Sequence, residues 1–242
     1  MIKNLFKGYD QGPVNEEKML LSFVLDKSGS MYGMPIERLE KSINRCAEDI
    51  MKDEKAADRI DVQIIAFNDT PEVVQDWTPM TQMKHISLNA DGGTCIEPAL
   101  DYAVESMKSR GHLYSELGTG LKKPWIVLIT DGYGGDVTNI AKKIKQRTEE
   151  GKMKLWVLGV PGYDKDTINQ LCGVDESGLP IRFYELSDPN GYNFEGFFKF
   201  IGASVKALST SAPGATVTIS DDCNPDVTNL GISRPTDKWL ND

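Results

Sequence analysis

Histidine and paired cysteines are scarce in this chain of 242 residues. The only histidines are His85 and His112, and the four cysteines are widely spaced without a CxxC pair. Zinc sites and histidine-dependent catalysis draw on these residue types, so the chain has few ways to build either. Both histidines stand in polar segments, which is typical of solvated surface residues.

Long apolar runs and an excess of positive charge are also missing. No run reaches the roughly 18 apolar residues of a membrane span, and the N-terminal segment lacks the features of a secretory signal. Acidic residues outnumber basic ones by 36 to 27, which gives a net charge of −9. Such a charge repels phosphate backbones and anionic lipids, so neither nucleic acid nor membrane is an expected partner. We expect a cytoplasmic protein.

Short apolar runs alternate with segments of helical period from residue 19 onward. This alternation predicts an α/β fold with a doubly wound, mostly parallel sheet of six strands and helices on both faces. The expected strands are 19–25, 60–67, 73–77, 125–130, 155–160 and 182–186. A turn at 68–71 folds the third strand back on the second, which predicts one antiparallel edge strand.

Apolar residues at spacings of three and four predict the helices between these strands. The expected helices are 36–52, 96–107, 137–149, 166–171 and 194–208. Residues 18–210 are expected to form one domain, between an N-terminal extension of 1–17 and a C-terminal extension of 211–242. Large apolar residues are sparse in the C-terminal extension, so we expect it to add little stability and to hold at most one strand, over 216–219.

Three polar clusters stand where the carboxyl edge of the sheet is expected. They are DKSGS at 26–30, GGT at 92–94 and TDG at 130–132. Loops at this edge converge on a crevice in open parallel sheets. The clusters offer carboxylates and hydroxyls, which suit Mg²⁺ or Mn²⁺ better than zinc. A cation held mainly by neutral hydroxyls keeps positive charge and attracts an anionic ligand from outside.

The DxSGS, GGT and TDG motifs, in this order, resemble the metal-ion-dependent adhesion site of von Willebrand factor type A (VWA) domains, over roughly residues 18–210. The resemblance implies a Rossmann-like VWA fold. It implies that Ser28, Ser30 and Thr94 supply hydroxyl ligands, while Asp26 and Asp131 bind the ion directly or through water. It also implies that an Asp or Glu of a partner protein completes the coordination.

Two further segments, DKSGSMYGMPIERL and FFKFIGASVKALSTS, are similar to stand-alone bacterial tellurium-resistance proteins of the TerY type. This finer resemblance implies a role in a tellurite or stress response. It also implies kinase or phosphatase partners, for which the residues themselves give no separate signal.

Each motif alone has a simpler interpretation. Asp26, a serine of 28–30 or Thr94 can cap a helix, and Asp131-Gly132 is a common turn. Asp69 and Asp136 are acidic residues near the same edge, but we assign them to a turn and a helix cap and leave them out of the ligand set.

The leading hypothesis is therefore a binding module that captures a partner's acidic side chain through Mg²⁺ or Mn²⁺. It would not be an enzyme and would have no catalytic residues and no organic cofactor. One alternative is a structural component of an assembly with a vestigial site. Another is a Mg²⁺-dependent phosphatase of the haloacid-dehalogenase type, which needs a second Asp where this chain has Ser28.

Overall fold

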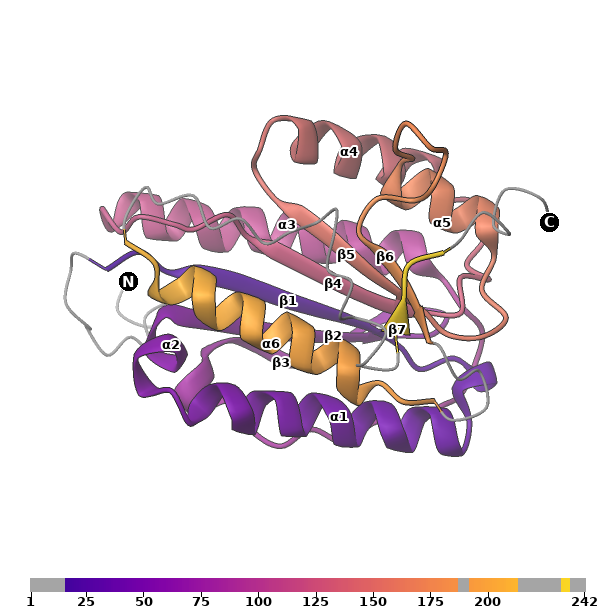
Figure 1. Cartoon of the computed structure of the whole chain (residues 1–242), viewed down its shortest axis with the longest axis horizontal. Coiled ribbons are helices and arrows are strands. Elements are labelled where there is room, and N and C mark those ends of the chain that lie inside the picture. Colours follow the sequence, from indigo (N-terminus) through magenta and orange to yellow (C-terminus); the bar gives the residue numbers. More distant parts are fainter. Residues whose placement is uncertain (1–15, 187–191, 213–231, 236–242) are drawn as a thin grey trace.

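A computed structural model describes residues 16–186, 192–212 and 232–235. In this part of the chain a central sheet lies between two layers of helices (Figure 1). The strand order is β3-β2-β1-β4-β5-β6-β7. The strands are β1 (Met19–Asp26), β2 (Ile60–Phe67), β3 (Pro71–Pro79), β4 (Trp125–Thr130), β5 (Lys154–Gly159), β6 (Phe183–Leu186) and β7 (Ile232–Ser233).

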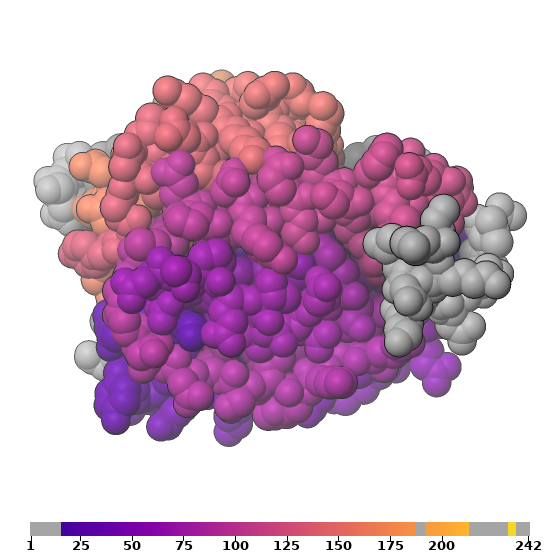
Figure 2. Space-filling view, turned by 180° about the vertical axis from the view of Figure 1, so that it is seen from behind, coloured from indigo at the N-terminus to yellow at the C-terminus, as the bar shows by residue number. Residues whose placement is uncertain are grey.

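The helices divide between the two faces of the sheet. They are α1 (Met34–Met51), α2 (Glu54–Arg59), α3 (Ile96–Glu116), α4 (Thr138–Glu149), α5 (Lys165–Cys172) and α6 (Glu195–Thr210), with 3-10 turns η1 (Gly29–Met31) and η2 (Met80–Gln82). Helices α1, α2 and α6 cover one face, and α3, α4 and α5 cover the other (Figure 1). On the rear of the molecule the magenta surface of α3 adjoins the purple surface of edge strand β3 (Figure 2).

The sheet confirms the predicted fold class. Strands β2, β1, β4, β5 and β6 pair in parallel, while β3 pairs with β2 in the antiparallel sense. All eight residues of β1 are buried, because their side chains alternate between the two helical layers. A parallel strand that is covered on both faces has a nearly continuous run of apolar residues, and this pattern predicted β1. None of the helices in the described ranges is both long enough and apolar enough to cross a membrane.

Besides the two 3-10 turns, one α-helix and one strand were not expected. Helix α2 begins after Asp53, whose side chain accepts a hydrogen bond from the backbone N of Ala56 at 3.1 Å. Strand β7 adds a seventh strand, antiparallel to β6, at the edge opposite β3.

Strand β7 differs from the expectation for residues 211–242, which placed at most one strand there, over 216–219. Ile232 pairs with Leu186 and is fully buried in the core beneath α6. Arg234 also bonds the carboxylate of Asp175 at 3.2 Å. Part of the C-terminal extension therefore completes the core, although its composition is polar. The strand expected over 216–219 lies outside the described residues.

Candidate functional site

The candidate site lies at the carboxyl ends of β1 and β4, where the strand order reverses. Strand β1 pairs with β2 on one side and with β4 on the other. The strands before β4 in the chain therefore extend the sheet in one direction from β1, and those from β4 onward extend it in the other. Ligands of open α/β sheets bind in the crevice at such a switch point. Asp26 is the last residue of β1 and Asp131 follows the last residue of β4, so both carboxylates stand at this crevice.

The carboxylate of Asp26 is held by two neighbouring motifs. Its Oδ1 accepts a hydrogen bond from the backbone N of Ser28 at 2.9 Å, and its Oδ2 accepts one from Thr130 Oγ1 at 2.7 Å. Thr130 Oγ1 in turn accepts a hydrogen bond from the backbone N of Gly132 at 2.9 Å. The DKSGS and TDG motifs are therefore bonded to each other through a buried aspartate.

The hydroxyl groups form a second connection between the same motifs. Ser30 Oγ donates a short hydrogen bond to Asp131 Oδ2, and the Oγ atoms of Ser28 and Ser30 lie 3.0 Å apart. Ser28 is buried and Ser30 is exposed, so the row of oxygens runs from the interior to solvent. The structure thus brings four predicted ligands together: Asp26, Ser28, Ser30 and Asp131.

The loop that carries Thr94 lies beside this group. The backbone N of Gly29 donates to the carbonyl of Gly92 at 3.0 Å, and the backbone N of Asp91 donates to the carbonyl of Lys27 at 2.9 Å. Among the described residues, Thr94 makes no hydrogen bond to the other four predicted ligands. It is partly exposed, two residues beyond the carbonyl that joins the loops.

The structure does not favour the capping interpretation of these polar residues. Helix α1 begins after Gly33, and helix α3 begins after Cys95 rather than Thr94. Neither position supplies a side-chain cap, nor does Ser28 at the start of η1. Helix capping therefore does not explain why serines and Thr94 occupy these positions.

The two aspartates left out of the ligand set have local roles. Asp69 Oδ2 accepts a hydrogen bond from the backbone N of Gly93 at 3.2 Å, so it shapes the loop that bears Thr94. Asp136 Oδ1 accepts one from the backbone N of Thr138 at 2.9 Å in the first turn of α4. Hydrogen bonds from the side chain and then the backbone of Thr138 lower the pKa of Asp136.

Negative charge is buried at the site without a cationic side chain beside it. Asp26 is fully buried and Asp131 is 5 % exposed. Burial raises the pKa of Asp26, hydrogen bonds from Ser28 and Thr130 oppose that rise, and the charge of Asp131 adds to it. Lys27 pairs instead with Glu72 at 2.9 Å, and no ion pair within the described ranges includes Asp26 or Asp131.

This donor set fits a hard divalent cation. Buried carboxylates without a counter-charge are costly, and a metal ion would supply the missing positive charge. The oxygens of Ser28, Ser30, Asp26 and Asp131 are the ligand type that Mg²⁺ and Mn²⁺ prefer. In the described ranges, no three side chains of His, Cys, Asp or Glu gather to hold a metal ion, so a cation at this site would need the hydroxyl oxygens as well as the two carboxylates.

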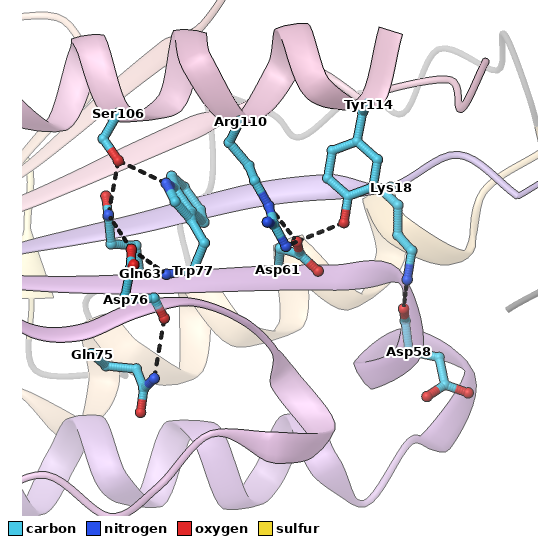
Figure 3. Close-up of polar contacts among 10 residues, drawn as sticks. All are labelled: Lys18, Asp58, Asp61, Gln63, Gln75, Asp76, Trp77, Ser106, Arg110 and Tyr114. Atoms are coloured by element: carbon cyan, nitrogen blue, oxygen red, sulfur yellow. Dashed lines mark hydrogen bonds and ion pairs between the residues drawn. The ribbon is translucent and has the colours of Figure 1, made fainter. Parts of the chain in front are cut away.

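Polar contacts that the sequence did not predict hold α3 against β2 and β3 (Figure 3). Asp61 Oδ2 accepts hydrogen bonds from Arg110 Nη2 at 2.6 Å and from the hydroxyl of Tyr114 at 2.6 Å. One turn nearer the site, Ser106 Oγ accepts hydrogen bonds from Gln63 Nε2 at 2.8 Å and from Trp77 Nε1 at 2.7 Å. These contacts fix the helix that begins directly after the Thr94 loop.

The fold and the site define an open α/β domain with a carboxylate and hydroxyl cluster at its switch point. Residues 21–133 match the family model of the von Willebrand factor type A domain. This range of the chain contains all five predicted ligands. Residues 21–133 are therefore similar to a VWA domain. Domains of this type are often metal-dependent protein-interaction modules.

Three known proteins are similar to this chain. The chain is 26 % identical over 194 residues to inter-alpha-trypsin inhibitor heavy chain H3 of Bos taurus, a match that covers 73 % of this chain and 20 % of the relative. This chain therefore spans about a fifth of the length of that protein. A von Willebrand factor type A structure from Catenulispora acidiphila has a TM-score of 0.55 at 14 % identity, covering 78 % of this chain and 43 % of the other. The manganese-loaded TRAP protein of Plasmodium vivax has a TM-score of 0.50 at 18 % identity, covering 72 % and 70 %. At these identities the two structures establish similarity of fold.

Proposed function

We propose that this protein is a metal-dependent protein-interaction module, which binds an acidic side chain of a partner through Mg²⁺ or Mn²⁺ held by Asp26, Ser28, Ser30, Thr94 and Asp131. The observation that carries the proposal is the contact between Ser30 and the buried Asp131, next to a second buried carboxylate, that of Asp26. Within the described ranges, neither aspartate forms an ion pair with a cationic side chain. The manganese-loaded TRAP protein, similar in fold, supports the choice of metal.

The residues divide the work between charge and orientation. Asp26 and Asp131 provide the negative charge that attracts a cation, and Thr130 fixes the Asp26 carboxylate through a hydrogen bond of 2.7 Å. The serine hydroxyls are neutral ligands, so a bound cation is left with positive charge for an external carboxylate. Ser30 is exposed, which leaves the outer side of the cluster open to a partner.

The phosphatase alternative finds less support in the structure. Ser28 stands where that chemistry needs a second aspartate, and its hydroxyl faces Ser30. His112 lies on α3 with its Nε2 3.4 Å from Glu116 Oε1, and His85 is exposed in the loop after η2, so neither belongs to the cluster. Metal-dependent turnover of generic phosphate esters that is lost in Asp26→Asn would nevertheless establish this alternative.

Calorimetric titration of Mg²⁺ and Mn²⁺ into the full chain tests the proposal. We expect one site per chain, which is lost in the variant that combines Asp26→Ala with Asp131→Ala and weakened in Ser30→Ala. Because Ser30 is exposed, its substitution leaves the fold intact and separates loss of a ligand from loss of structure. Asp136→Asn is the matched control, since it removes an acidic side chain at the same edge without touching the cluster.

Equal metal binding by the wild type and the double variant would overturn the assignment. A second outcome concerns the partner. If the protein binds Mg²⁺ or Mn²⁺ but still binds its partner after EDTA has removed the metal, the structural alternative with a vestigial site is the better description.

The resemblance to TerY-type proteins extends the proposal to a cytoplasmic role in a tellurite or stress response, with kinase or phosphatase partners. This extension rests on the sequence resemblance alone. Growth of a deletion strain on tellurite, with and without the gene encoding the Ser30→Ala variant, tests it.

A further inference from the structure

Two exposed tyrosines flank the candidate metal site. Tyr32 is 80 % exposed and Tyr133 is 66 % exposed. Each stands two residues after a member of the Ser30 and Asp131 pair, whose side chains are in contact. Two residues of chain span only about 7 Å, so both tyrosines belong to the rim of the site.

This concentration of exposed apolar surface is specific to the site. Seven large hydrophobic residues are exposed in the described part of the chain, and three of them stand close to the candidate ligands. Tyr32 and Tyr133 belong to the two loops that bear these ligands, and Met34 is the first residue of α1. The other four are far apart in the sequence: Val73 on β3, Tyr102 on α3, Leu117 directly after α3 and Val174 in the turn after α5. Solitary exposed apolar residues are ordinary, but three around one polar site indicate contact with another molecule.

Core packing and hydrogen bonds hold the backbone of the loops that carry Tyr32 and Tyr133. Met31, next to Tyr32, is 1 % exposed and packs in the core. The backbone N of Tyr133 donates to Asp131 Oδ1 at 3.4 Å, and the preceding Gly132 is bonded to Thr130. An anchored backbone lowers the entropy lost on binding, and tyrosine is enriched among the residues that dominate protein interfaces.

Charge decides what kind of partner this rim fits. The chain has a net charge of −9, and Asp69, Asp91 and Asp136 are exposed in loops at the same edge. A continuous acidic segment would be repelled by them, whereas a single carboxylate directed at the cation would not.

We infer that the partner presents one Asp or Glu from an apolar surface, with aliphatic or aromatic neighbours that pack on Tyr32, Met34 and Tyr133. This inference rests on the proposed function, because the carboxylate needs the cation. The cation supplies the attraction, and the rim selects which acidic residue is accepted.

Selection from a peptide library tests the inference. The library displays seven-residue peptides with a fixed central Asp and random flanks, and the immobilised full chain selects from it in Mg²⁺. We expect enrichment of aliphatic and aromatic residues next to the Asp. Selected peptides should bind about tenfold or more weakly to the variant that combines Tyr32→Ser with Tyr133→Ser. Tyr102→Ser, which removes an exposed tyrosine on α3, is the matched control and should bind as the wild type does.

The outcomes separate the two proposals. Enrichment that needs Asp and Mg²⁺ but favours acidic or random flanks would overturn the inference and leave the proposed function standing. Enrichment no greater than from a library with a fixed central Asn would overturn both. Calorimetry of the double tyrosine variant with Mg²⁺ should give the wild-type affinity, and a lost metal site would show that the tyrosines support the ligands rather than the partner.

Discussion

Replacing Arg110 with methionine should destabilise the protein through the aspartate that it leaves behind. The side chain of Asp61 is 1 % exposed, and its Oδ2 accepts hydrogen bonds from Arg110 Nε at 3.0 Å and Nη2 at 2.6 Å (Figure 3). Its Oδ1 is buried without a hydrogen-bond partner among the described residues. Methionine keeps most of the length of arginine but removes the charge, so only the Tyr114 hydroxyl would remain to stabilise a buried carboxylate.

The expected loss follows from this geometry. Breaking a buried ion pair by removing one partner costs about 3–5 kcal/mol. For a chain of this size, a loss of 3 kcal/mol lowers the melting temperature by about 6–12 °C. Asp61→Asn should cost less, about 1–3 kcal/mol, because Arg110 is 14 % exposed in its side chain and keeps access to water.

A double-mutant cycle measured by urea unfolding and circular dichroism tests the reasoning. The variant that combines Asp61→Asn with Arg110→Met should lose less free energy of unfolding than the sum of the two single variants, since neither partner leaves a buried charge. Tyr114→Phe, which removes one hydrogen bond, should cost about 1 kcal/mol. A loss below about 1 kcal/mol in Arg110→Met, or strict additivity in the cycle, would refute the argument.

Two further predictions concern other buried groups. Burial raises the pKa of the Cys46 thiol to about 12, so little thiolate exists near pH 8. Iodoacetamide should therefore modify Cys46 slowly until the protein unfolds, as followed by mass spectrometry. Modification as fast as that of a cysteine in a short peptide would contradict the position of Cys46 between α1 and α6. Ile232→Ala should lower the free energy of unfolding by about 2–4 kcal/mol, because Ile232 is fully buried; a change below about 0.5 kcal/mol would mean that β7 does not complete the core in solution.

The layered fold was predictable because the strands are buried on both faces. The strand Trp125–Thr130 is apolar at every position except the last, and a run of this kind has few interpretations other than a central strand. Strand β7 was not predictable, since two residues give no periodicity and Ile232 stands in a polar segment. Its place depends on pairing with β6, which a local pattern does not reveal.

The candidate site was predictable for a related reason. Asp26, Ser28 and Ser30 are close in sequence, and parallel topology brings the end of β4 beside them, so the strand pattern was enough to predict their meeting with Asp131. The pairing of Asp61 with Arg110 spans 49 positions and joins a strand to a helix. The signal for it was present in β2, where Asp61 and Gln63 occupy alternate positions of a strand that is buried throughout. Buried polar residues on one face of a strand require partners in the covering helix.

The central claim is that the carboxyl edge of the sheet holds a divalent cation, and diffraction from crystals grown with Mn²⁺ tests it most directly. At the manganese absorption edge, the account predicts one anomalous peak per chain, coordinated by the hydroxyl oxygens of Ser28 and Ser30 and adjacent to Asp26, Thr94 and Asp131. Crystals of the Ser30→Ala variant should show a weaker peak at the same place. A peak elsewhere on the chain, or none at a saturating concentration of Mn²⁺, would contradict the account.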